Sequence, residues 1–125
     1  MNEQTMNALI NACRNDPELI DLLSEILKHF EDYHRAIIAL ESYAALHDYA
    51  NTDRDQYREQ FEGMDAARTR LHNVVLDDMR LLNKLADSFG LSPVYDGVIS
   101  ADRPYRRQVA NAALAYLEHM ITERR

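Results

Sequence analysis

Apolar residues recur along this chain in two long runs whose steps alternate between three and four residues. The runs occupy residues 19–47 and 57–89. A repeat of this kind over such a length is typical of helices that pack as a coiled coil. Folding the chain back at residues 50–52 brings the two runs together and places Tyr33 opposite Arg68. The pattern therefore predicts a long antiparallel helical hairpin.

Turn and cap residues divide the rest of the chain. Asp16 and Pro17 suit the start of a helix, and Gly90 suits the position just after a helix end. We expect an all-α, four-helix bundle-like fold in a single domain, 1–125. It consists of the long hairpin with a shorter N-terminal and a C-terminal helix. The predicted helices are 5–14, 17–49, from a Thr52 cap to 89, and from about Asp102 or Arg103 to 122.

The flanks of the hairpin differ in polarity. One flank, with Leu22 and Ala36, is apolar well along the hairpin, so we expect the last helix to pack there. The other flank is apolar only near the base, which is enough for the first helix, and then becomes charged where His34 faces Asp65. The apolar loop 91–101 should lie against the bundle.

The hairpin tip is longer than the remaining helices can cover. Uncovered aromatic and aliphatic surface of this kind marks an interface, so we expect self-association as a homodimer, with another protein as a possible partner. The alternative is that the 91–101 loop extends to the tip and covers it. The interface candidates are Tyr43, Leu46, Tyr49, Tyr57 and Phe61.

Composition excludes some classes of protein. The net charge of −7 argues against nucleic-acid and anionic-membrane binding, which depend on cationic surface. The single cysteine, Cys13, rules out an intrachain disulfide and a multi-cysteine metal cluster, and it lies on an apolar helix face. No apolar stretch approaches membrane-spanning length. We expect a cytoplasmic protein with no membrane association and no cofactor.

Arg68 interrupts the second apolar run. A buried guanidinium needs partners, and Asp65, His72 and, across the seam, His34 are within reach by helical spacing. These four residues are the catalytic candidates of a small hydrolase or nuclease. An arginine followed by a histidine also resembles the motif of small helical RNases, although the spacing differs here. The alternative is a structural polar layer that fixes the register of the hairpin.

A second alternative is a metal-binding bundle. Glu31 and His34 match one half of a di-iron carboxylate site in a four-helix bundle, but the chain has no second half. A mononuclear site would combine Glu31 and His34 with His72.

Three arginines lie at the start of the last predicted helix: Arg103, Arg106 and Arg107. Positive charge opposes the helix dipole at that end. Either Asp96 and Asp102 compensate, or a bound anion does.

Two stretches, His47–Arg54 at the tip and Asp102–Arg107, resemble a family of small bacterial helical proteins catalogued only as a domain of unknown function. The resemblance implies a bacterial or phage source and no activity or catalytic residue. The leading hypothesis from the sequence is a non-enzymatic helical bundle that acts through protein contacts.

Overall fold

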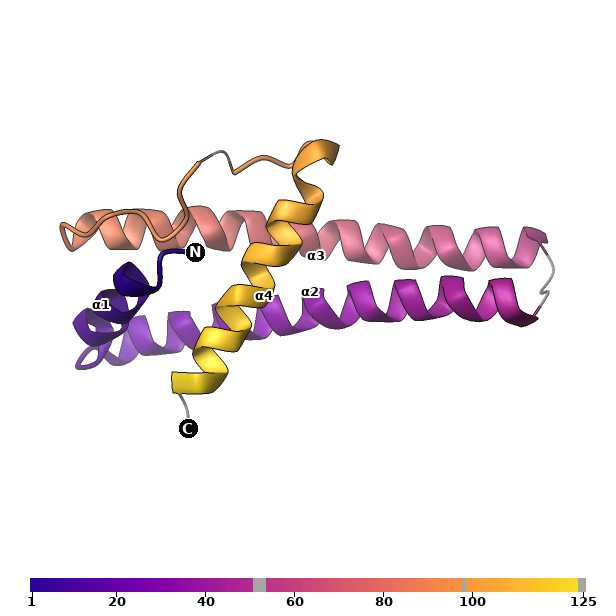
Figure 1. The fold of residues 1–125 in the computed structure, drawn as a ribbon. Helices are drawn as coiled ribbons and strands as arrows, with labels where there is room; N and C mark the ends of the chain where they lie inside the picture. The colour runs from indigo at the N-terminus through magenta and orange to yellow at the C-terminus, as the bar shows by residue number, and fades with distance from the viewer. Residues whose placement is uncertain (51–53, 98, 124–125) are drawn as a thin grey trace.

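The fold is a long two-helix hairpin with two shorter helices across one side of its base (Figure 1). In the computed structural model, the backbone is described for residues 1–50, 54–97 and 99–123, and side chains for 1–47, 54–97 and 99–122. The described residues contain no strand. The helices are α1 (Glu3–Cys13), α2 (Pro17–Ala50), α3 (Arg54–Ser88) and α4 (Arg106–Glu123), with a 3₁₀ turn, η1 (Arg103–Tyr105), before α4. The all-α prediction is confirmed.

The helix ends follow from local capping. The side chain of Asn2 accepts a hydrogen bond from the Thr5 N–H (3.1 Å) at the start of α1. Oδ1 of Asp16 accepts from the Glu18 and Leu19 N–H groups at the start of α2 (3.0 and 3.3 Å), which confirms the predicted cap. The predicted Thr52 cap lies outside the described residues.

The end of α3 is a Schellman motif. Gly90 has a φ of 71°, in the left-handed region that favours glycine, and the Leu91 N–H donates to the Ala86 carbonyl at 2.9 Å. This motif turns the chain back so that the following loop runs along α3.

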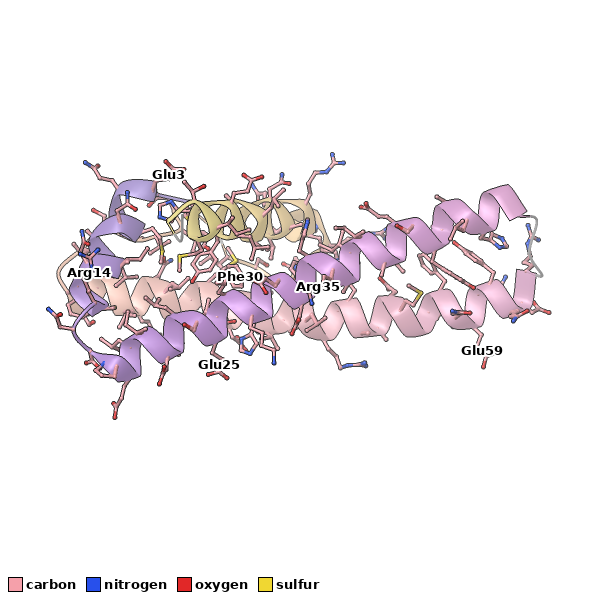
Figure 2. The ribbon with its side chains drawn as sticks, turned by 90° about the horizontal axis from the view of Figure 1, so that it is seen from below. Glu3, Arg14, Glu25, Phe30, Arg35 and Glu59 are labelled. Atoms are coloured by element: carbon pink, nitrogen blue, oxygen red, sulfur yellow. The ribbon has the colours of Figure 1, made fainter. Side chains whose placement is uncertain are left out.

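The last helix lies on the opposite flank from the one predicted. Both α1 and α4 pack on the same side of the hairpin, where Leu27, Met79 and Ala86 are buried (Figure 2). Tyr116 of α4 packs its ring on Phe30, with centroids 4.5 Å apart. Ala113 of α4 is buried in the same core cluster as Leu27 and Met79, and its small side chain allows close helix packing.

The flank predicted to hold α4 carries neither short helix. Leu22 and Leu81 are half-buried on it, and Val74 is 37% exposed. His29 interrupts its apolar surface and contacts Asp78 at 2.7 Å. Among the described residues, Asp78 pairs with His29, and the nearby Arg80 pairs with Asp77 instead.

Loop 91–101 lies against the base of the hairpin, as predicted. Val94 and Tyr95 are buried, and the Asn83 side chain holds the Tyr95 backbone by two hydrogen bonds (Nδ2 to O, 3.0 Å; N to Oδ1, 2.9 Å). The Asn2 N–H donates to the Val94 carbonyl at 2.7 Å, which ties α1 to the same loop. The alternative in which this loop covers the tip is therefore wrong.

One cluster of buried apolar residues fills the base, with contributions from all four helices and the loop. Cys13 is part of it, as predicted. Along the described chain, no helix is both long and apolar enough to cross a membrane.

Candidate functional site

Arg68 forms a buried polar layer in the middle of the hairpin. The residue is 7% exposed. Its Nε donates to Oδ1 of Asp65 and one terminal nitrogen donates to Oγ1 of Thr69, both at 3.0 Å. Tyr33 lies beside it: burial raises the pKa of the Tyr33 phenol, and the charge and hydrogen bond of Arg68 oppose that rise. The predicted proximity of Tyr33 and Arg68 is confirmed.

Asp65 pairs with Arg68 and not with His34. Within the described part of the chain, His34 makes no ion pair with Asp65. Asp65 and Arg68 are three residues apart on the same helix, so their side chains lie within ion-pair distance. A buried guanidinium without a partner would be costly, and the Asp65 carboxylate removes that cost.

His72 lies under α4 in the core. It is buried, packs edge-on against the Tyr33 ring (centroids 5.6 Å apart), and its Nε2 has no hydrogen-bond partner among the described residues. Burial lowers the pKa of His72, and the charges of Arg68 and Arg106 lower it further. The imidazole is thus held neutral and away from solvent.

The three arginines before and within α4 separate in space. Arg106 and Arg107 line a cleft of about 420 Å³ between α4 and the hairpin, together with Arg68, and Arg103 does not. His34 also lines this cleft, whereas His72 does not. The four catalytic candidates are therefore divided between the cleft wall (Arg68 and His34), the half-buried Asp65, which pairs with Arg68, and the buried His72.

The metal candidates are not gathered into one site. Glu31 and His34 line a shallow hollow against the last turns of α4, and His72 is not part of it. Over residues 1–47, 54–97 and 99–122, no group of three or more His, Cys, Asp or Glu side chains is placed to hold a metal ion.

The tip carries a ladder of aromatic rings on the seam. Tyr43 and Tyr57 stack with centroids 5.5 Å apart, His47 stacks on Tyr57 at 3.6 Å, and Phe61 continues the ladder at 5.5 Å from Tyr57. The fifth side chain of the predicted interface, Tyr49, lies outside the described side chains. Leu46 is 64% exposed.

A second hollow was not predicted from the sequence. A cavity of about 500 Å³ lies between loop 91–101, α4 and Met1. Tyr95 lines it and is buried, and the Tyr95 hydroxyl has no hydrogen-bond partner in the described structure. The apolar residues of loop 91–101 indicated that the loop packs against the bundle. They did not indicate which surface it covers or that a cavity lies beside it.

Comparison with protein-family models, with curated proteins and with solved structures finds no match to this chain.

Proposed function

We propose that this protein is a helical-bundle module that acts through protein contacts and self-associates through the distal part of its hairpin. The observation that carries the proposal is the lack of cover over residues 42–47 and 54–64, which we call the distal hairpin. In Figure 1 these segments project beyond α1, α4 and loop 91–101.

Two helices with no others packed against them bury only the side chains between them. In the distal hairpin Tyr43, Tyr57 and Phe61 remain half-buried and Leu46 stays exposed. Burial of apolar surface contributes about 25 cal/mol for each Å² removed from water. A second pair of helices against this ribbon would turn it into a four-helix bundle, which is the arrangement the base of the molecule already has.

One face of the hairpin suits such a partner. On the side away from α4, a strip without formal charge runs over the outer half of the hairpin; we call it the uncharged strip. Charged residues of the same region, such as Glu41, Arg58 and Glu62, lie on the other faces by heptad position. The strip consists of Ala36, Ala39, Tyr43, Leu46, Gln60, Gly63 and Ala67.

The composition of the strip favours a second copy of the same chain as the occupant. Four of its residues are alanine or glycine, which allow helices to approach closely, and no charge has to be desolvated. Because the strip bears no charge of either sign, it does not repel itself, as a two-fold interface requires.

Gly63 allows a test that leaves the monomer intact. A Cβ added at Gly63 meets no atom within 4 Å, and replacing a mid-helix glycine favours the helix by about 1 kcal/mol. Gly63→Leu should therefore fold at least as well as the wild type. It should nevertheless block close approach on the strip.

The experiment is sedimentation velocity at micromolar concentration, with thermal unfolding recorded in parallel. We expect a wild-type dimer, a monomeric Gly63→Leu variant with undiminished thermal stability, and a dimeric Ala66→Leu variant. Ala66 is the matched control because it is exposed on the outer face of the same helix. A monomeric wild type, or a dimer that survives Gly63→Leu and Leu46→Glu alike, would overturn self-association through this strip.

A further inference from the structure

Arg106 and Arg107 have no acidic partner within the described structure. The ion pairs there join other residues, and neither Asp96 nor Asp102 lies within ion-pair distance of the two arginines. Both side chains are exposed in the first turn of α4, where the helix dipole is itself positive. Of the two alternatives that the sequence left open, compensation by Asp96 and Asp102 is therefore not found among the described residues.

The path of α4 brings Arg106 and Arg107 close to a third arginine, Arg68. Figure 1 shows α4 starting beside α3 and crossing the hairpin obliquely toward the base. Its first turn thereby lies over Arg68, which lines the same cleft as Arg106 and Arg107. Arg106 is close enough to act electrostatically on both Tyr33 and His72 in the layer below.

Arg68 keeps hydrogen-bonding capacity for the cleft. A guanidinium has five N–H donors. Asp65 and Thr69 on α3 each accept from one of them, and Arg68 also forms a hydrogen bond with the Tyr33 side chain, which lines the same cleft. Arg68 is buried yet lines the cleft, and these hydrogen bonds leave N–H donors of its guanidinium unused.

The cleft has a cationic end and an apolar wall. Its volume of about 420 Å³ falls within the range of small-ligand pockets, roughly 300–1,000 Å³. Three arginines line it against one carboxylate, Glu41, in a chain whose net charge is −7. The wall is formed by Ile37, Ala110 and Leu114.

We propose that this cleft binds a small phosphorylated ligand, with its phosphate among Arg68, Arg106 and Arg107 and its body against Ile37, Ala110 and Leu114. Guanidinium groups pair with phosphate through parallel N–H···O bonds. Arg68 is already paired with Asp65, whereas Arg106 and Arg107 have no acidic partner among the described residues. A phosphate monoester carries close to two negative charges, so it matches these two guanidinium groups better than a carboxylate ligand with a single charge does. The proposal is independent of self-association, because the uncharged strip lies on the other side of the hairpin.

The arginines themselves supply a matched control. Arg106→Gln and Arg107→Gln remove one charge each from the cleft. Arg103→Gln removes the same charge three residues away, from a side chain that is exposed and outside the cleft. All three variants leave the buried layer around Arg68 unchanged, so folding is not at risk.

The experiment is titration calorimetry with phenyl phosphate, inorganic phosphate and benzoate at constant ionic strength. We expect phenyl phosphate to bind more tightly than the other two, and Arg106→Gln or Arg107→Gln to weaken it by about tenfold, as loss of a charge-assisted hydrogen bond does. Arg103→Gln should bind like the wild type. Backbone NMR shifts on titration should centre on Ala110 and Leu114.

Several results would overturn the proposal. No heat with phenyl phosphate, or equal weakening by Arg103→Gln and Arg106→Gln, would show that charge near α4 is not organised into a site. Equal affinity for benzoate would remove the selectivity for phosphate. Tighter binding of a phosphoserine peptide than of phenyl phosphate would reassign the cleft to a phosphorylated protein partner.

Discussion

Nδ1 of His29 on α2 lies 2.7 Å from Oδ2 of Asp78 on α3, and this contact joins the two long helices on their uncovered flank. The pair replaces an apolar contact at a point where neither short helix covers the hairpin. Burial raises the pKa of the Asp78 carboxyl, and the hydrogen bond and charge of His29 oppose that rise. The hydrogen bond and charge of His29 therefore stabilise the ionised form of the buried Asp78 carboxyl.

Removing His29 should destabilise the hairpin. His29→Ala leaves the Asp78 carboxylate without its partner, and we expect a loss of about 1–2 kcal/mol in the free energy of unfolding at neutral pH, measured by urea denaturation. In a double-mutant cycle with Asp78→Ala, the double variant should lose less than the two single variants together. Glu25→Ala is the control, because Glu25 lies 3.9 Å from His29 and is mostly exposed. Strictly additive losses would mean that the pair contributes nothing.

Loop 91–101 should depend on one side chain. Asn83→Ala removes both hydrogen bonds that hold the Tyr95 backbone, and we expect a loss of about 1–3 kcal/mol. Hydrogen exchange of the Tyr95 amide should accelerate while the middle of α2 remains protected. Lys84→Ala, at the next and exposed position of α3, should change neither quantity. If Asn83→Ala leaves the Tyr95 amide protected, the loop is held by packing alone.

The Tyr95 hydroxyl should contribute nothing to stability. It is buried without a hydrogen-bond partner among the described residues, and burial raises the pKa of this phenol. Tyr95→Phe removes an unsatisfied polar group, so we expect unchanged stability or a gain of up to about 1 kcal/mol by thermal unfolding. Tyr116→Phe should lose stability, since the Tyr116 hydroxyl donates to the Leu23 carbonyl at 3.5 Å. A clear loss for Tyr95→Phe would indicate a water-mediated bond in the adjoining cavity.

Stability should fall in mild acid because of His72. Its pKa in the folded protein is lowered from 6.5 by burial and by the charges of Arg68 and Arg106, with a hydrogen bond to Asn73 acting in the opposite direction. The unfolded chain therefore takes up this proton at a higher pH than the folded one. The contribution of neutral His72 to the free energy of unfolding is therefore fully present above pH 6.5. It is lost as the pH falls through the lowered pKa of His72 in the folded protein.

The measurement compares urea unfolding of the wild type and of His72→Leu between about pH 7.5 and 5. Leucine is similar in size and does not titrate, so the wild type should lose stability more steeply than the variant as the pH falls. Parallel pH profiles would show that His72 is protonated equally in the folded and unfolded chains.

Local patterns in the sequence determined the elements of this fold. The heptad steps predict the hairpin and the proximity of Tyr33 and Arg68, and Asp16 and Gly90 mark helix ends because their side-chain or backbone chemistry acts over a few residues. The placement of Asp65 beside Arg68 follows from their spacing of three residues on one helix. The apolar residues of loop 91–101 indicated that this loop packs against the bundle. Each of these inferences needs only contacts within one helix or across one regular seam.

The choice of flank for α4 was decided by the tertiary structure. The apolar flank with Leu22 looked the better surface, but α1 and α4 both settle over Leu27 and Met79, because Tyr116 fits against Phe30 there. That choice depends on how whole side chains fit together, which periodicity does not encode. It also decides what the surface offers: α4 carries Arg106 and Arg107 to Arg68 and leaves the opposite face of the hairpin uncovered.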